Sequence, residues 1–483
     1  MTELYDAIIV GSGAGGAAAA FRLAEAGRRI LVLEKGPELP TDGSTQDIRI
    51  VVAEGRFHNH DPWLDRRGRE FVPQEYYNLG GKTKWYGAAL LRFAPEEFAA
   101  NPASQYRGWP FGYDELEPYY DQAETLLRVR SFEVEPDTAR LVAALKRVAP
   151  AWRAAPMPLG LSSRILDDPR EATRFDGFAS VHHLKSDAEV CLLDRIRDKP
   201  NVTISAGRPV RTLLGDDTAP HRITGVVTAD GVTLKARSVL LAAGALSSPQ
   251  LLANYLATSG LADKLPCALS VGRNFKRHLL TAVVAWSPSR KGDLLRKTIV
   301  LTHDRFPHSS VQPLGAALTE GDSIATELPS FAPRWIADFV GERAYGFFLQ
   351  TEDGSHPDNR VIAANGAGRP RLDYDSHRIA PSRDEHRRFV RAFAFDLLRA
   401  GMIPIVKPVP LGGTAHACGT LIAGDDPATS VVDGLGRVHG MTNLYVVDGS
   451  ALPRSSRVNP ALTIYAWALR VADKLDQSLG ADR

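Results

Sequence analysis

Cysteine is scarce in this chain, which contains only three cysteines among 483 residues. Cys191, Cys267 and Cys418 lie far apart in the sequence, so their spacing predicts neither a disulfide framework nor a metal-binding cluster. This usage of cysteine suits a reducing compartment. We therefore expect a protein of the cytoplasm that has no metal site.

Net charge and long apolar runs are also lacking. The formal net charge is +2, and no basic run interleaves with aromatic residues, which argues against nucleic acid or a membrane surface as a partner. No uninterrupted apolar segment approaches the roughly 20 residues that span a bilayer. The first predicted strand begins so close to Met1 that no signal peptide is expected.

The remaining composition is typical of a globular protein with a large core. Hydrophobic residues make up 44% and charged residues 24% of the chain. A chain of this length can form two domains or one elaborate domain. The positions of its glycines and apolar runs therefore carry the information on function.

The first 35 residues contain the strongest pattern. An apolar run at 7–10 is followed by a glycine-rich turn at 11–16, an alanine-rich segment that extends to about residue 26, and a second apolar run at 30–33 that ends at Glu34. This order predicts a strand, a tight turn, a helix and a second strand. The arrangement is typical of a dinucleotide-binding unit.

Three glycines of that turn, and the acid that follows the second strand, each have a physical reason for their position. Gly11 permits a tight turn, Gly13 lets the backbone approach a pyrophosphate, and Gly16 lets the helix pack on the strand. The phosphates would lie at the N-terminus of the helix, where free N–H groups favour anions. Glu34 is placed to accept hydrogen bonds from a ribose hydroxyl.

A second glycine-rich segment covers residues 78–92 and reads NLGGKTKWYGAALLR. Gly80 and Gly81 lack the Cβ atoms that would prevent the backbone from lying flat against a ring system. Taken alone, the segment is explained equally well as a connection with a packed Trp85.

Residues 202–243 are rich in predicted strands separated by turn signals such as Asp230-Gly231. A β-meander that precedes a strand returning to a parallel sheet is typical of FAD-binding variants of the dinucleotide fold, so we expect FAD and not NAD. Ser248 and Pro249 predict the start of the next helix.

The remaining segments predict a second domain. Strand-like runs and breaker-rich loops alternate between 281 and 404, and residues 383–399 predict an amphipathic helix with a basic, solvated face. We therefore expect an α/β protein in which an FAD-binding Rossmann-type domain, made of a parallel sheet and a β-meander, carries an antiparallel-sheet substrate domain. The predicted division is 1–135, 196–283 and 405–483 for FAD, and 136–195 and 284–404 for the substrate.

Several candidate functional residues lie near the C-terminus. His416 lies in a glycine-punctuated loop, and Asp448-Gly449 follows a predicted strand. Asn459 and Pro460 predict a helix with Asn459 as N-cap and Pro460 in the first helical position. Taken alone, His416 is better explained as a structural histidine and Asn459 as a plain cap.

Together these motifs resemble the glucose–methanol–choline (GMC) oxidoreductases, FAD enzymes that oxidise alcohols. The resemblance covers most of the chain except parts of 136–195 and 284–345. It rests on GSGAGG, NLGGKTKWYGAALLR, WPFGYDELEPYY, SVLLAAGALSSPQLL, VGRN, HACGT, DPATSVVD, NLYVVDGSALP and NPALT.

The resemblance implies roles for individual residues. His416 would be the catalytic base over the flavin and Asn459 its partner. The implied cofactor-binding residues are Gly11, Gly13, Gly16, Glu34, Lys35, Gly80, Gly81, Thr83, Trp85, Val210, Ala243, Gly244, Asp448, Gly449, Asn459 and Pro460.

Several alternatives stay open at this point. The loop Thr83-Lys84-Trp85 is nearest to the branch that oxidises pyranoses, which favours a sugar, glycoside or polyol; a non-sugar primary alcohol is the runner-up. A GMC-type lyase with non-redox FAD and a non-catalytic flavin-binding protein are further alternatives. The electron acceptor can be oxygen, a quinone or another carrier, and the oligomeric state is open. Some relatives tether FAD through a histidine where this chain has Lys84, so we expect non-covalent FAD.

Overall fold

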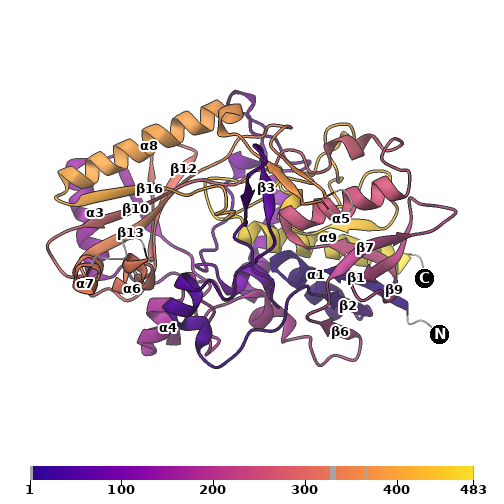
Figure 1. The fold of residues 1–483 in the computed structure, drawn as a ribbon, viewed down its shortest axis with the longest axis horizontal. Helices are drawn as coiled ribbons and strands as arrows, with labels where there is room; N and C mark the ends of the chain where they lie inside the picture. Colours follow the sequence, from indigo (N-terminus) through magenta and orange to yellow (C-terminus); the bar gives the residue numbers. More distant parts are fainter. Residues whose placement is uncertain (1–3, 327–332, 365–367, 482–483) are drawn as a thin grey trace.

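The computed structural model describes residues 4–326, 333–364 and 368–481. Two large sheets occupy opposite ends of the long axis, and both chain termini lie at the end that holds β1 and β9 (Figure 1). A small sheet that contains β3 lies between them in this view.

The first sheet has a parallel core with the order β6-β2-β1-β9, and β17 pairs with β9 in the same direction. Residues 7–10 and 30–33 are buried, as expected for strands covered on both faces. The strands of this core are β1 (Leu4–Val10), β2 (Ile30–Leu33), β6 (Val202–Ser205), β9 (Thr233–Leu241) and β17 (Leu444–Val446).

The predicted β-meander is confirmed. Strands β7 (Val210–Gly215) and β8 (Ile223–Thr228) add to β9 in antiparallel order. Strands β8 and β17 share one edge of β9, because β8 pairs with residues 233–235 and β17 with residues 239–241. The fold class expected from the sequence, a parallel sheet with an attached meander, is therefore the one observed.

Four helices pack around this sheet: α1 (Ala14–Glu25), α2 (Tyr113–Leu126), α5 (Gly244–Thr258) and α9 (Ala461–Ala481). The prediction that a helix starts at Ser248-Pro249 is wrong, because α5 begins at Gly244 and contains Pro249. Proline cannot donate to the carbonyl four residues earlier. The Thr420 hydroxyl supplies that bond instead, donating to the carbonyl of Ala245 at 2.7 Å.

The second sheet is antiparallel throughout and has the order β16-β10-β13-β12-β11-β5. Its strands are β5 (Trp152–Pro156), β10 (Leu279–Trp286), β11 (Ile299–His303), β12 (Ser309–Pro313), β13 (Ala344–Thr351) and β16 (Ile403–Pro408). The division into two domains by residue number stays a prediction; β10 and β16 both cross its boundaries at 283/284 and 404/405.

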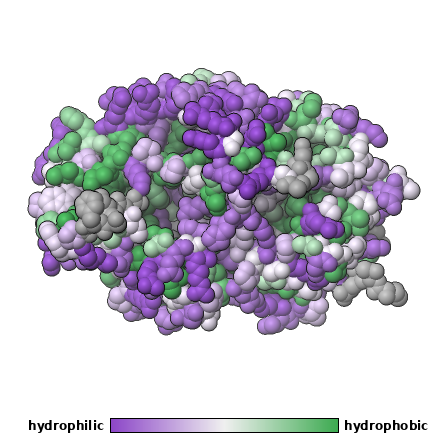
Figure 2. Space-filling model, in the orientation of Figure 1, coloured by the Kyte–Doolittle hydropathy of each residue, from purple (hydrophilic) through white to green (hydrophobic). Residues whose placement is uncertain are grey.

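Helix α8 (Ala380–Arg399) lies along one face of the second sheet (Figure 1) and matches the predicted amphipathic helix. Phe389 and Phe393 of α8 join the core of that sheet together with Leu145 of α3 (Pro136–Val148). Hydrophilic residues cover much of the surface over α8 (Figure 2), although Phe395 and Leu398 are exposed as well. As the predicted basic face requires, the exposed residues of α8 include Arg387, Arg388, Arg391 and Arg399.

The remaining elements are short. They are β3 (Trp63–Asp65), β4 (Glu70–Phe71), β14 (Arg360–Ile362), β15 (Arg371–Asp373), α4 (Pro169–Arg174), α6 (Gly321–Ala325) and α7 (Arg334–Gly341). Within the described ranges, no helix is both long and apolar enough to cross a membrane. In the same part of the chain, no group of three or more His, Cys, Asp or Glu side chains could hold a metal ion.

Candidate active site

The glycine turn between β1 and α1 has the geometry that a dinucleotide needs. A Cβ atom on Gly11 would overlap the carbonyl oxygen of Ala242, and one on Gly16 would overlap the carbonyl oxygen of Gly11. Around Gly13, by contrast, no heavy atom lies within 4 Å of the position that a Cβ would take. Gly11 and Gly16 therefore serve close packing, whereas Gly13 leaves an open approach to the start of α1.

The start of α1 also fits an anionic group. Gly13 is the N-cap of α1, and no side chain caps this helix there. The N–H groups of a first helical turn have no acceptor inside the helix, and together with the helix dipole they favour a phosphate. The residues present at this position thus fit the pyrophosphate of FAD.

Glu34 is directed back toward the same turn. Its carboxylate accepts hydrogen bonds from Ser12 N at 3.0 Å, from Ser12 Oγ at 2.6 Å and from Gly36 N at 3.0 Å. A carboxylate offers about four acceptor sites, so capacity for a ribose hydroxyl is left. Burial raises the pKa of Glu34. Lys35 turns away, because its Nζ contacts Asp61 at 2.5 Å on the surface.

The segment that precedes Val210 runs beside Glu34. Arg208 N donates to the carbonyl of Glu34 at 2.7 Å, and Gly207 N donates to the carbonyl of Gly36 at 2.7 Å. Val210, the first residue of β7, is therefore brought near the predicted ribose acid although it is distant from it in the sequence.

The second glycine-rich segment joins this turn. Gly80 N donates to Ser12 Oγ at 3.1 Å. A Cβ on Gly81 would lie 3.1 Å from Gly13 Cα, so the short 3-10 turn Gly81–Lys84 approaches the glycine turn closely. Thr83 Oγ1 donates to the carbonyl of Gly80 at 2.6 Å and accepts from Ala188 N at 3.0 Å.

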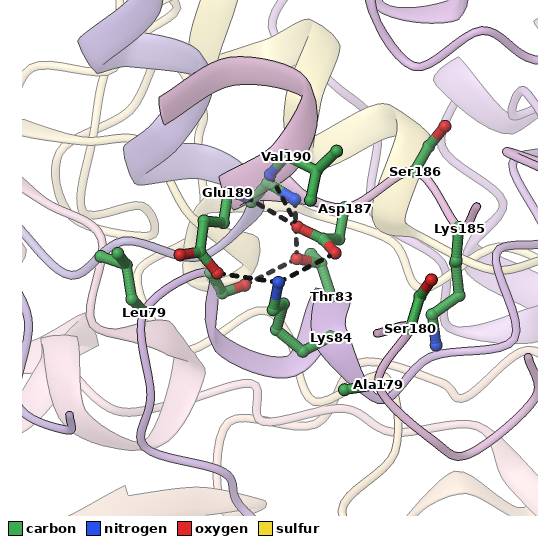
Figure 3. Close-up of polar contacts among 12 residues, drawn as sticks. Leu79, Thr83, Lys84, Ala179, Ser180, Lys185, Ser186, Asp187, Glu189 and Val190 are labelled. Carbon is green, nitrogen blue, oxygen red and sulfur yellow. Dashed lines mark hydrogen bonds and ion pairs between the residues drawn. The ribbon is translucent and has the colours of Figure 1, made fainter. Parts of the chain in front are cut away.

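Lys84 lies in a charged cluster, which consists of the buried Lys84 and Asp187 and the partly buried Glu189 (Figure 3). Its Nζ lies 3.2 Å from Asp187 Oδ2 and 2.8 Å from Glu189 Oε2. Burial by itself lowers the pKa of Lys84, but the two carboxylates outweigh burial, and the pKa is raised. The ammonium group therefore keeps its proton at neutral pH.

Trp85 packs in an aromatic group. Its ring stacks on Tyr76 with a centroid distance of 5.0 Å and lies 5.1 Å from Phe57, and its Nε1 donates to Asn78 Oδ1 at 2.9 Å. The structure thus shows the packed tryptophan that the sequence left as an alternative. Contact of Trp85 with FAD stays a prediction.

Asp448 ties the ends of two parallel strands together. Its carboxylate accepts from Gly244 N at 2.8 Å, from Ser248 Oγ at 2.5 Å and from Ser450 N at 2.8 Å. Burial raises the pKa of Asp448. Ala243-Gly244 after β9 and Asp448-Gly449 after β17 are therefore held side by side at the carboxyl end of the parallel sheet.

The two predicted catalytic side chains are in contact. His416 Nε2 lies 3.2 Å from Asn459 Nδ2, and Asn459 Oδ1 accepts a hydrogen bond from Gln312 Nε2. The prediction of Asn459 as N-cap is wrong, because α9 begins at Ala461 and Ile464 N donates to the carbonyl of Pro460 at 2.9 Å. The Asn459 amide is instead engaged by side chains from other parts of the chain.

His416 is held in an unusual backbone conformation. Its φ is 62°, in the left-handed region that costs a non-glycine residue about 1–2 kcal/mol. Burial lowers the pKa of His416 well below its usual value, and the nearby His278, Lys82 and Lys297 lower it further. The imidazole is therefore neutral near pH 7.

Two further residues complete the arrangement, and the sequence analysis did not select either of them. His278 immediately precedes β10, and its Nδ1 lies 2.6 Å from His416 Nδ1. Gln312 lies in β12. Both come from the antiparallel sheet or its edge and are more than a hundred positions from their partners, so no local pattern could indicate them.

The chain matches a known protein family over most of its length. The profile of GMC oxidoreductases matches residues 5–280 with its N-terminal part and residues 405–468 with its C-terminal part. This match confirms the resemblance that the motifs indicated.

Similar proteins support the same assignment. Paromamine 6'-oxidase of Streptomyces fradiae is 31% identical, over 97% of this chain and 91% of the relative. The 6'''-hydroxyparomomycin C oxidase of Streptomyces lividus is 27% identical, over 100% and 93%. The solved structure of pyridoxine 4-oxidase from Mesorbium loti has the same fold, with a TM-score of 0.68, 19% identity, and coverage of 97% of this chain and 99% of that one. The chain therefore belongs to the GMC oxidoreductase family and is an FAD-dependent alcohol oxidoreductase.

Proposed function

We propose that this enzyme oxidises a hydroxyl group of a sugar, glycoside or polyol, with His416 as general base and Asn459 as its partner. The observation that carries this proposal is the contact of His416 Nε2 with Asn459 Nδ2 at 3.2 Å, just before the N-terminus of α9. FAD, when bound, accepts the hydride from the alcohol carbon.

The residues of the chain provide the other half of the reaction. The neutral imidazole of His416 takes the hydroxyl proton at Nε2, and the amide of Asn459 holds the alcohol oxygen. The positive end of α9 stabilises negative charge that develops close to its first turn. Both side chains are positioned before substrate arrives, which lowers the entropic part of the barrier.

Two observations favour a sugar-like substrate. The relatives reported above are named for oxidation of paromamine and of 6'''-hydroxyparomomycin C. The loop Thr83-Lys84-Trp85 is nearest to the pyranose-oxidising branch of the family. The runner-up is a non-sugar primary alcohol.

The test is anaerobic reduction of the purified holoenzyme by a panel of sugars, glycosides, polyols and simple primary alcohols. A sugar-like compound should bleach the flavin absorbance at the lowest concentration. Best saturation by a simple primary alcohol would favour the runner-up, and an unbleached flavin with every alcohol would favour a lyase. Reoxidation by air, a quinone or a dye then identifies the class of electron acceptor.

The role of His416 is tested by the variant His416→Ala. Flavin reduction should slow by roughly 100- to 10,000-fold, the usual contribution of general-base catalysis. FAD content should stay near that of the wild type, because the imidazole is not proposed to hold the cofactor. Reduction at the wild-type rate would refute the assignment.

We also propose that FAD is bound without a covalent link. The support is the environment of Lys84, whose Nζ is buried between Asp187 and Glu189 and keeps its proton, so it is no nucleophile. Acid precipitation should release the yellow colour into the supernatant. Colour in the pellet, together with a protein mass increased by that of FAD, would contradict this proposal.

A further inference from the structure

We infer that His278 is a positioning residue that fixes the tautomer of His416, so that the lone pair of His416 is at Nε2, on the side of Asn459. This inference rests on the proposed role of His416 as base. It adds a residue from the antiparallel sheet to the proposed machinery and gives each hydrogen bond of the site a direction.

The direction is set at one end by a backbone carbonyl. His278 Nε2 lies 2.8 Å from the carbonyl oxygen of Ser456, which can only accept, so Nε2 of His278 carries the proton. A neutral imidazole has one N–H, so Nδ1 of His278 is an acceptor. His416 Nδ1, at 2.6 Å, must then donate to it, and Nε2 of His416 is left without a proton.

The other end of the chain of hydrogen bonds requires the same direction. Gln312 Nε2 donates to Asn459 Oδ1, so the Nδ2 group of Asn459 faces His416 and donates to its Nε2. If the Asn459 amide were turned round, His416 Nε2 would need a proton and both facing Nδ1 atoms would be acceptors. Only one arrangement of neutral rings satisfies all four contacts.

The carbonyl that anchors the chain is itself held in place. Ser456 has a φ of 65°, and its Oγ donates to the two carboxylate oxygens of Glu97 at 2.8 and 2.9 Å. Glu97 also accepts from Arg457 N at 3.0 Å. The buried Glu97 therefore fixes the backbone whose carbonyl selects the tautomer of His278, and through it that of His416.

Both rings are neutral in this arrangement. Burial lowers the pKa of His278 to about 4, and the adjacent Arg277 lowers it as well. The charged or titratable groups beside the two rings are Arg277, His386, Lys82 and Lys297. Glu97 lies one step further away and contacts Ser456. The four groups beside the rings are cationic or can become so, and they disfavour a proton on either ring.

The consequence for the reaction is a single site for the incoming proton. When the alcohol hydroxyl takes the place of the Asn459 N–H at His416 Nε2, its O–H bond breaks and an N–H bond forms at that nitrogen, while the hydride leaves the carbon for FAD, when FAD is bound. His416 then carries a positive charge, and its Nδ1–H still donates to the neutral Nδ1 of His278. The wrong tautomer would present an N–H to the hydroxyl and could not accept the proton.

The direct test is the tautomer itself. The holoenzyme is labelled with ¹⁵N-histidine, and long-range ¹H–¹⁵N correlation spectra show which ring nitrogen of each histidine carries the proton. The His416 signals are assigned from their loss in His416→Ala. We expect a proton on Nδ1 and none on Nε2 at pH 7; a proton on Nε2 of His416 would overturn the inference.

Two substitutions at 278 separate positioning from packing. His278→Asn keeps an acceptor, Oδ1, where Nδ1 lies, and should retain flavin reduction within about threefold and the Nδ1–H tautomer of His416. His278→Leu removes the acceptor and should slow flavin reduction at least tenfold. The loss should not exceed that of His416→Ala, which is expected to be roughly 100- to 10,000-fold. His303→Leu is the matched control, because His303 is a buried histidine of β11 in the same sheet, accepts from Arg305 N at 3.1 Å and has no part in the proposed site.

The outcomes distinguish this inference from the proposed function. If His416→Ala reduces the flavin at the wild-type rate, the proposed base is wrong. If His416→Ala is slow but His278→Leu is as fast as the His303→Leu control, only the inference about His278 fails. If His278→Leu does not fold, the wild-type and His278→Asn tautomers still decide.

Discussion

Two largely buried polar clusters of this molecule respond to burial in opposite ways. The charged cluster of Lys84, Asp187 and Glu189 keeps a protonated amine. The neutral chain of Gln312, Asn459, His416 and His278 keeps imidazoles without a positive charge. Burial lowers the pKa of the basic nitrogen in both, so the neighbours decide: two carboxylates reverse the effect at Lys84, whereas cations and neutral groups reinforce it at His416.

This difference matches two different tasks. Paired charges in a buried site make a connection that is costly to break, and the charged cluster joins the turn Gly81–Lys84 to residues 187–189. A neutral imidazole with an unprotonated Nε2 can take up a proton, which the Lys84 ammonium cannot do at neutral pH. One cluster therefore suits holding a loop and the other suits chemistry.

Removal of the amine from the charged cluster should have the largest effect on stability. Lys84→Met leaves the buried Asp187 without its ion-pair partner, while Glu189 keeps its contact with Arg197 at 3.2 Å, and we expect a loss of about 3–5 kcal/mol in the free energy of unfolding. Urea denaturation followed by circular dichroism measures it. The matched control is Arg153→Met, which breaks an exposed pair with Asp304 at 2.7 Å and should change the free energy of unfolding by less than about 1 kcal/mol. An equal free energy of unfolding in the two variants would show that Lys84 contributes no more to stability than an exposed ion pair does.

Acid should weaken the neutral chain. In the unfolded state His278 has a pKa near 6.5, while burial lowers the pKa to about 4 in the folded state, so the unfolded state binds the proton first as the pH falls. The stability that depends on a neutral His278 is complete above pH 6.5 and is lost as the pH falls toward 4. His278→Leu lacks this loss, so its stability deficit relative to the wild type should shrink by about 2 kcal/mol between pH 7 and pH 5.

Other titrating groups are controlled for by comparing His278→Leu with the wild type at each pH. Burial raises the pKa of Glu352 and of Asp353 to about 7, and their titration is common to both proteins and cancels. Urea midpoints at pH 5, 6 and 7 give the comparison. A deficit that is the same at all three pH values would show that folding does not lower the pKa of His278.

The smallest effect is expected at Asn459. Asn459→Ala removes one hydrogen bond to His416 and one from Gln312, and it should slow flavin reduction by about 5- to 10-fold, equivalent to about 1 kcal/mol. The loss of these hydrogen bonds should lower the free energy of unfolding by about 1 kcal/mol, although Asn459 is not the cap of α9. A rate as low as that of His416→Ala would show that Asn459 and His416 act as one unit.

Local sequence was sufficient for the elements that depend on neighbours in the chain. The apolar runs at 7–10 and 30–33 are buried parallel strands, and the meander before β9 is present as predicted. Gly11 and Gly16 have the close contacts that their positions in the turn required. Periodicity and glycine placement act over a few residues, so they are readable without a structure.

Distant contacts decided the points at which local patterns failed. Pro249 is inside α5 because the Thr420 hydroxyl supplies the bond that proline cannot make. Asn459 is a typical N-cap residue by type, yet its amide is taken by Gln312 and His416. In both cases a side chain from another element replaced the local hydrogen bond on which the prediction depended.

The state of the candidate base is the clearest case of a property that only the folded chain specifies. The sequence indicated His416 through a family motif, but its protonation and tautomer depend on His278, which lies 138 positions away, and on the carbonyl of Ser456. A pKa is set by burial and by charges within a few ångströms, and a tautomer is set by the hydrogen bond at the opposite ring nitrogen. Both quantities arise from distances in space, which the order of residues along the chain does not contain.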